Sequence, residues 1–141
     1  MTALQKELLA GRFEILGEVG RGAAGVVYRA MDVPSGEPSA LKVIASTGDD
    51  PLEQQRFLQE GEVLSSLTHP GIVAVHDFDS TDDGVHFIVM DLLEGATLET
   101  RLARVGRLEW LEARRVALEI TDAVGAAHRA GILHRDLKPA N

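Results

Sequence analysis

Three glycines spaced as G-x-G-x-x-G, at positions 20, 22 and 25, constrain the fold of this chain more than any other feature. The preceding segment "RFEILGEVGRG" is typical of a strand, and the following "VVYRA" is strand-like as well. A dinucleotide-binding loop requires a helix directly after its glycines, which disfavours that fold. The motif instead predicts a strand–loop–strand hairpin. It is either a plain glycine turn or a loop whose backbone N–H groups approach phosphate oxygens.

The rest of the chain predicts three more strands and three helices. "PSGEP" and the Asp83-Gly84 pair indicate turns, and Asp50-Pro51 with Glu53 resembles a helix start with a capping box. Strands before and after a single helix, followed by helices, predict an α+β arrangement with a five-stranded antiparallel sheet and a boundary near Glu94-Gly95. The expected strands are 12–22, 25–33, 39–45, 72–78 and 85–93, and the expected helices are 52–67, a short one within 95–106, and 109–130 with Gly131 as its C-cap.

Composition excludes several classes of protein. The formal net charge of -8 disfavours a nucleic-acid partner, because phosphate backbones are bound mainly through Lys and Arg. The absence of cysteine excludes disulfides and thiolate metal sites, and it fits a reducing compartment. No run of 18 or more apolar residues predicts a membrane span, and the N-terminus lacks the apolar stretch of a signal peptide.

Two charged residues lie on apolar surfaces of the expected elements. In "ALKVI", Lys42 shares one strand face with Ala40 and Ile44. It is either an edge-strand lysine whose ammonium reaches solvent or a partly buried ammonium that needs an anionic partner. Glu60 falls on the helical stripe formed by Phe57, Leu64 and Leu67. We therefore expect Glu60 to face the sheet and pair with Lys42, the alternative being a solvated position at the edge of the stripe.

The last eight residues, "HRDLKPAN", carry the groups that phosphoryl transfer requires. Asp136 can accept or orient a hydroxyl proton, and Lys138 can neutralise charge on a phosphoryl group. Asn141 can give a carbonyl oxygen to Mg²⁺, a cation that prefers oxygen ligands. The alternative is a polar surface loop after a helix, which the order of residue types and the preceding features disfavour.

With these motifs, the sequence from about Arg12 to Asn141 resembles a protein kinase domain, specifically the bacterial relatives of eukaryotic Ser/Thr kinases. The resemblance implies phosphoryl transfer from ATP, with Mg²⁺, to Ser or Thr of a protein. It also implies the cytoplasm as the location, although the full-length protein of such kinases is often membrane-anchored. The implied catalytic residues are Asp136 and Lys138; the implied metal ligand is Asn141; the implied ATP-binding residues are Val19, Gly20, Gly22, Gly25, Val27, Ala40, Lys42, Glu60, Met90 (gatekeeper), Asp91 and Leu93.

The same resemblance divides the chain into an N-terminal extension (1–11), a small lobe with the hinge (12–94) and the first part of a large lobe (95–141). Two details depart from the family pattern: the loop tip is Ala23-Ala24, and Gly61 interrupts a helix at a cost of about 1 kcal/mol against alanine. The family's D-F-G and A-P-E motifs do not occur in these 141 residues. We therefore expect a truncated domain with negligible phosphotransfer of its own, the alternative being a non-catalytic nucleotide-binding or interaction remnant.

Overall fold

The computed structural model describes residues 8–22, 25–44 and 51–141, with only the backbone of residues 53 and 54. The expected N-cap at Asp50 and the Glu53 side chain therefore lie outside the described residues. The chain divides into two compact units. One unit comprises Met1–Ser66 with Ala74–Leu92, and the other comprises Leu67–Val73 with Leu93–Asn141. Residues 67–73 thus belong with the second unit, which the sequence did not indicate.

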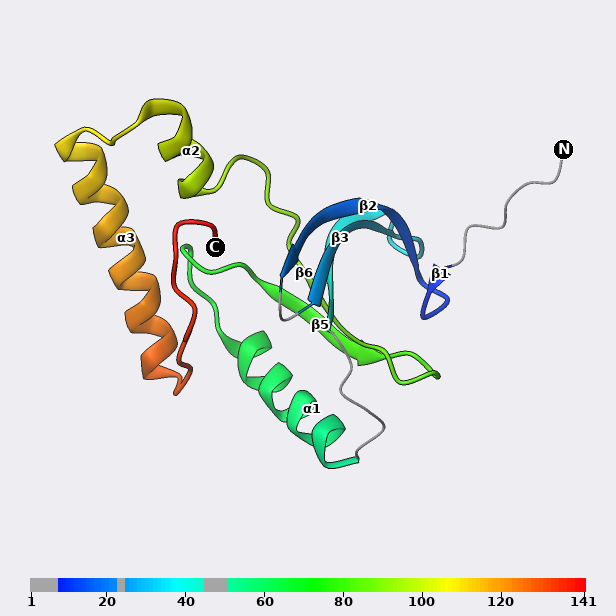
Figure 1. The fold of residues 1–141 in the computed structure, drawn as a ribbon. Helices are drawn as coiled ribbons and strands as arrows, with labels where there is room; N and C mark the ends of the chain where they lie inside the picture. Colours follow the sequence, from blue (N-terminus) through cyan, green and yellow to red (C-terminus); the bar gives the residue numbers. More distant parts are fainter. Residues whose placement is uncertain (1–7, 23–24, 45–50) are drawn as a thin grey trace, which may run out of the picture. The chain divides into compact units, whose positions relative to one another are not determined.

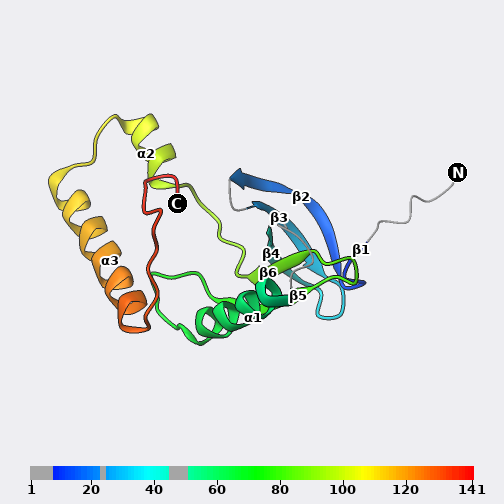
Figure 2. The ribbon, with the colours of Figure 1, turned by 60° about the horizontal axis from the view of Figure 1, so that its bottom comes forward.

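The first unit contains an antiparallel sheet of six strands: β1 (Leu8–Leu9), β2 (Phe13–Gly22), β3 (Gly25–Asp32), β4 (Glu37–Ile44), β5 (Val75–Ser80) and β6 (His86–Met90). Their order in the sheet is β1-β2-β3-β4-β6-β5. Five strands were expected. The sixth is the two-residue strand β1, which lies in the predicted N-terminal extension (1–11) and pairs with the start of β2. Curvature of the β2–β3 hairpin is plain in Figures 1 and 2.

One face of this sheet carries the hydrophobic core. Strand alternation places Leu41 on the opposite face from Ala40 and Lys42, and Leu41 is fully buried. The rings of Phe13 and Phe87 meet edge to face, with centroids 5.9 Å apart. The cluster consists of Phe13, Ala30, Leu41, Phe87 and Val89, with Leu9, Ile15 and Val43 packed against it.

Helix α1 (Pro51–Ser66) packs on β5 through aromatic side chains. The Phe57 ring stacks on His86 at 4.8 Å and meets the Phe78 ring edge to face at 6.1 Å. Gly61 is buried against the same Phe78 ring, where an added Cβ would lie 2.5 Å from two ring atoms. The glycine that looked like a departure from the helix pattern is therefore what lets the helix approach this strand.

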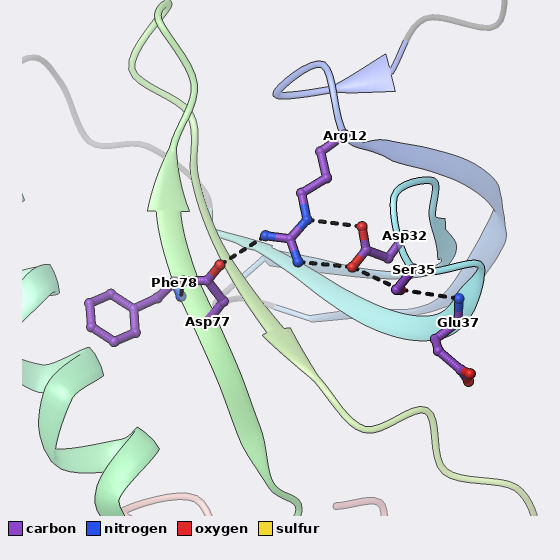
Figure 3. Close-up of polar contacts among 6 residues, drawn as sticks. All are labelled: Arg12, Asp32, Ser35, Glu37, Asp77 and Phe78. Carbon is purple, nitrogen blue, oxygen red and sulfur yellow. Dashed lines mark hydrogen bonds and ion pairs between the residues drawn. The ribbon is translucent and has the colours of Figure 1, made fainter.

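Arg12 joins three parts of the sheet (Figure 3). Its guanidinium donates two hydrogen bonds to Asp32 at the end of β3, at 2.9 and 2.8 Å, and one to Asp77 of β5 at 3.0 Å. The Ser35 hydroxyl donates a further bond to Asp32. Arg12 holds the pKa of Asp32 below its ordinary value, chiefly through these hydrogen bonds. The buried Asp32 carboxylate is thus held ionised by a bidentate partner.

The second unit contains helices α2 (Leu98–Val105) and α3 (Trp110–Arg129). The Thr97 hydroxyl caps α2 by accepting the Thr100 N–H at 3.1 Å, and Arg101 of α2 binds Glu112 of α3 at 2.7 Å. Helix α3 ends at Arg129 and has Ala130 as its C-cap, one residue before the expected cap Gly131, which follows at φ 78°.

His69 attaches the 67–73 segment to α3 within the second unit. Its Nδ1 accepts the Gly71 N–H at 3.0 Å, so Nε2 carries the proton that is donated to Asp122 at 3.0 Å. None of the residues of α3 is buried, and Trp110 and Leu111 are about three-quarters exposed. Among the described residues, no helix is long and apolar enough to cross a membrane.

Candidate active site

The fold imposes different constraints on the three glycines of the β2–β3 hairpin. Gly25 has φ 135°, and a Cβ there would overlap the carbonyl oxygen of Val43, so the backbone itself requires glycine. Gly20 and Gly22 have no positive φ, and a Cβ on either would meet nothing within 4 Å among the described residues. The described part of the fold does not itself require glycine at these two positions, and close approach of a phosphate ligand to them stays a prediction.

Lys42 lies in a cross-strand row that begins at the glycine hairpin. Gly20 pairs with Val27, Val27 with Lys42, and Lys42 with Ile88. Strand β4 is flanked by β3 and β6, so the edge-strand alternative for Lys42 is excluded. The side chain is half-buried and makes no ion pair with any residue in the described part of the chain. A partly desolvated ammonium without a counter-charge favours binding of an anion.

Apolar side chains surround Lys42 on its face of the sheet. Ala40 is buried and pairs with Met90, and Val27 is opposite Lys42 in register. These three residues lie on the face opposite the core cluster, as the strand alternation predicts. Val19, the fourth residue expected here, lies at an irregularity of β2 and is 59% exposed.

Glu60 does not occupy the position expected of it. Its side chain is exposed, and no ion pair joins it to Lys42 in the described residues. The inward face of α1 is formed by Phe57 and Gly61, which contact Phe78 and His86, and Glu60 is rotated about 100° from Gly61 around the helix. This corrects the expectation of an inward carboxylate; a role for Glu60 toward ATP stays a prediction.

Asp91, directly after β6, is held by two separate contacts. Its N–H donates to the carbonyl of Ala74 at 3.0 Å, and its carboxylate contacts Nε2 of His76 at 2.5 Å. The carbonyl of Asp91 makes no hydrogen bond within the described residues, and its contact with a ligand stays a prediction. Leu93, expected to contribute its backbone as well, belongs to the second unit and is 72% exposed.

The loop 134–141 in the second unit brings together the two expected catalytic residues, Asp136 and Lys138, and the expected metal ligand, Asn141. Arg135 has φ 61°, which lets the Asp136 N–H turn back to Nδ1 of His134 at 3.3 Å. Lys138 Nζ lies 3.0 Å from the Asp136 carboxylate, and the Asn141 amide nitrogen donates to the Asp136 carbonyl at 2.7 Å. Lys138, and then Asn141, lower the pKa of Asp136. Asp136 is therefore a carboxylate at neutral pH. A carboxylate can orient a hydroxyl group and accept its proton as that hydroxyl attacks.

The oxygen atoms of this loop could supply some, but not all, of the ligands of a hard divalent cation. Because the Asn141 amide nitrogen is occupied by Asp136, its side-chain oxygen is the atom available to a metal ion. Carboxylate and amide oxygens are the ligands Mg²⁺ prefers. In the described ranges no group of three or more His, Cys, Asp or Glu side chains could hold a metal ion, so these residues would supply only part of a coordination shell.

Known proteins share these sequence features. The family model described as protein kinase domain matches residues 13–141. The chain belongs to the protein kinase domain family. It is 40% identical over 136 residues to the serine/threonine-protein kinase PknK of Mycobacterium tuberculosis, covering 96% of this chain and 12% of that protein. It is also 36% identical to the serine/threonine-protein kinase PrkC of Bacillus subtilis, covering 94% of this chain and 20% of that protein.

Solved structures of the kinase family agree in fold. The crystal structure of the Mycobacterium tuberculosis PknI kinase domain superposes with a TM-score of 0.79 at 32% identity. The match covers 99% of this chain and 57% of that one. The chain thus spans a little over half of the solved kinase domain and a small part of the curated relatives it matches.

Several structurally important residues were not found from the sequence. Gly61 was noted only for its helix cost, although the aromatic Phe57 on the same helix and Phe78 on a strand were a signal that a close approach was needed. His76 and His69 carried no sequence signal, because a lone histidine reveals its partner only through tertiary structure. Both are nonetheless hydrogen-bonded to carboxylates distant in sequence, Asp91 and Asp122.

Proposed function

We propose that these residues form the ATP-binding and catalytic-loop portion of a serine/threonine protein kinase that acts in the cytoplasm. The observation that carries the proposal is the row Gly20–Val27–Lys42–Ile88. Lys42 has no ion-pair partner among the described residues and lies two strands away from Gly20. A Cβ at Gly20 would meet no described atom within 4 Å. Phosphate oxygens satisfy both features, because backbone N–H groups and a lysine are the groups that bind them.

The catalytic loop supplies the groups expected to act on the transferred phosphoryl group. Asp136 orients the hydroxyl of a Ser or Thr side chain and accepts its proton, while Lys138 neutralises charge on the phosphoryl oxygens. Mg²⁺, when bound, supplies charge neutralisation at the phosphates, and Asn141 would provide one of its ligands. The membership in the kinase family and the serine/threonine-kinase relatives support this assignment of roles.

Equilibrium binding of a fluorescent ATP analogue to the purified chain tests the proposal. We expect binding that Lys42→Met weakens at least tenfold, because a charge-assisted contact to phosphate is lost. Arg115→Met is the matched control, since Arg115 is an equally cationic residue whose side chain is 70% exposed on α3. No measurable binding, or an equal loss in both variants, would contradict the assignment of Lys42.

Phosphotransfer by the same 141 residues is expected to be negligible. The D-F-G aspartate, which holds Mg²⁺ in the family, is not among them, and loss of such a group typically lowers rates by orders of magnitude. The assay is transfer of labelled phosphate to a general protein substrate with Mg²⁺. Binding without transfer is the predicted outcome, whereas robust Mg²⁺-dependent transfer would refute it.

A further inference from the structure

Arginines gather where α2 and α3 meet, although the chain as a whole is acidic. Residues 101–115 contain five arginines and two glutamates, whereas the whole chain has a formal net charge of -8. Arg101 and Glu112 pair at 2.7 Å, so these two charges neutralise each other and tie the two helices together. The other four arginines of the segment face only one further glutamate in sequence, which leaves a local excess of positive charge.

Three of these arginines have no partner in the described ranges. Arg104, Arg107 and Arg114 are exposed, and their side chains form no ion pair or hydrogen bond with any described residue. Large apolar side chains are exposed beside them, Trp110 to 75% and Leu111 to 74%. Trp110 and Arg114 are four residues apart on α3, so their side chains are neighbours on the helix surface. We call these five residues the arginine surface.

The composition of the arginine surface favours an acidic protein segment as its partner. Arginine and tryptophan are enriched among the residues that contribute most to protein–protein binding, and a guanidinium binds a carboxylate through paired hydrogen bonds. Trp110 and Leu111 can contact an apolar side chain of the same segment. A membrane or a nucleic acid is disfavoured, because its negative charge extends over an area that also repels a chain of net charge -8.

The arginine surface lies within reach of a peptide bound at the catalytic loop. The Glu99 N–H, in the first turn of α2, donates to the carbonyl of Pro139 at 2.9 Å, so α2 begins beside the loop 134–141 (Figure 1). Arg104 lies further along α2 by about 8 Å, and Asp136 lies at most about 11 Å from Pro139. The path from Asp136 to Arg104 is therefore shorter than about 25 Å, which about seven or eight residues of extended chain can span.

We propose that the arginine surface docks an acidic segment of the protein substrate, within about eight residues of the Ser or Thr that lies at Asp136. The inference rests on the proposed kinase function and names its substrate class. Such substrates carry Asp or Glu residues and an apolar residue near the phosphorylated hydroxyl. Docking uses none of the residues proposed to bind ATP, so the two can be tested separately.

Fluorescence anisotropy measures binding to the 141-residue chain of a labelled peptide in which one serine is flanked by aspartates and a leucine. A matched peptide carries lysine in place of each aspartate. We expect saturable binding of the aspartate peptide alone, weakening as salt is raised. Combining Arg104→Gln with Arg107→Gln should weaken it about threefold to tenfold, the scale of two exposed ion pairs. Trp110→Ala should weaken it at least about fivefold, because an apolar anchor is lost.

Two exposed arginines of the first unit provide the matched control. Combining Arg29→Gln with Arg56→Gln removes the same charge outside the arginine surface and should leave the affinity unchanged. An equal loss in the two double variants, or equal affinity for the aspartate and lysine peptides, would overturn the inference. Binding of phosphatidylserine vesicles through the arginine surface, without binding of the aspartate peptide, would overturn it in favour of a membrane partner.

Amide NMR of the labelled chain tests whether the docked segment belongs to a substrate. The aspartate peptide should shift the amides of residues 104–114 and, through its serine, those of the loop 134–141. Shifts at residues 104–114 alone would refute the substrate assignment. All peptide measurements are made without nucleotide. Peptide binding without ATP binding would therefore refute the proposed ATP site, whereas ATP binding without peptide binding would refute only this inference.

Discussion

Replacing Gly61 by alanine should destabilise α1 even though alanine is the better helix former. An added Cβ would lie 2.5 Å from Cδ2 and Cγ of Phe78 and 2.7 Å from Cδ1. Cγ is bonded directly to the Phe78 Cβ, so the ring cannot move away by a change at its far end. The ring is also held edge to face by Phe57. Either the helix or the strand must shift to accept the methyl group.

The magnitude follows from two opposing contributions. Glycine to alanine inside a helix stabilises by about 1 kcal/mol. Inserting a methyl group into a packed contact costs about 1–3 kcal/mol. Gly61→Ala is therefore expected to change the free energy of unfolding by between about zero and a loss of 2 kcal/mol.

Gly125 provides a matched control within α3. A Cβ at Gly125 would meet only Nη1 of Arg129, at 3.3 Å, among the described residues, and the end of an arginine side chain moves easily. Gly125→Ala should therefore gain most of the helix contribution, about 1 kcal/mol. Because the helix contribution is common to both variants, their difference isolates the contact with Phe78, about 1–3 kcal/mol.

Urea denaturation followed by circular dichroism measures both variants, and amide hydrogen exchange locates the change in α1 or α3. In a Phe78→Ala background, Gly61→Ala should cost less than in the wild type, since alanine lacks the three ring atoms that the added Cβ would meet. An equal gain of stability in the two alanine variants would refute the reasoning, because it would mean that Phe78 does not restrict α1.

The remaining predictions concern the hairpin and the arginine cluster. Gly25→Ala should lower the urea midpoint, because Gly25 has a positive φ and an added Cβ would overlap the Val43 carbonyl. Gly20→Ala should leave the urea midpoint unchanged but weaken ATP binding, measured by fluorescence titration. Asp32→Asn should be less stable than the wild type at pH 7. Arg12 lowers the Asp32 pKa, so its stabilisation is complete above the unfolded pKa of about 4 and is lost as pH falls through the folded value. The two urea midpoints should therefore converge in acid, and a constant difference between pH 7 and pH 3 would contradict the ion-pair explanation.

The order of the main strands and helices followed from sequence because local patterns decide it. Alternation in "ALKVI" predicted that Leu41 and Lys42 lie on opposite faces, and the structure confirms this with Leu41 in the core. Strand β1 has only two residues and depends on pairing with Phe13 and Glu14, so no local signal of strand length was available for it.

The orientation of Glu60 was misjudged because helical periodicity cannot distinguish a stripe from its edge. Phe57 and Leu64 define a face that includes Glu60 or Gly61, and residue type favoured neither. The Phe78 ring packs against Gly61, so Gly61 and not Glu60 faces the sheet. Contacts between residues far apart in sequence, such as Arg12 with Asp77, are likewise set by strand order, which no local pattern contains.

A titration of the isotopically labelled chain with ATP and Mg²⁺, followed by amide NMR, tests the central claim most directly. The account predicts saturable shifts at Gly20, Gly22, Lys42 and the residues bordering Asp91, with the core strand residue Val89 unaffected. Shifts confined to other parts of the chain, or none at millimolar ATP, would contradict the assignment of a nucleotide site to the glycine hairpin and Lys42.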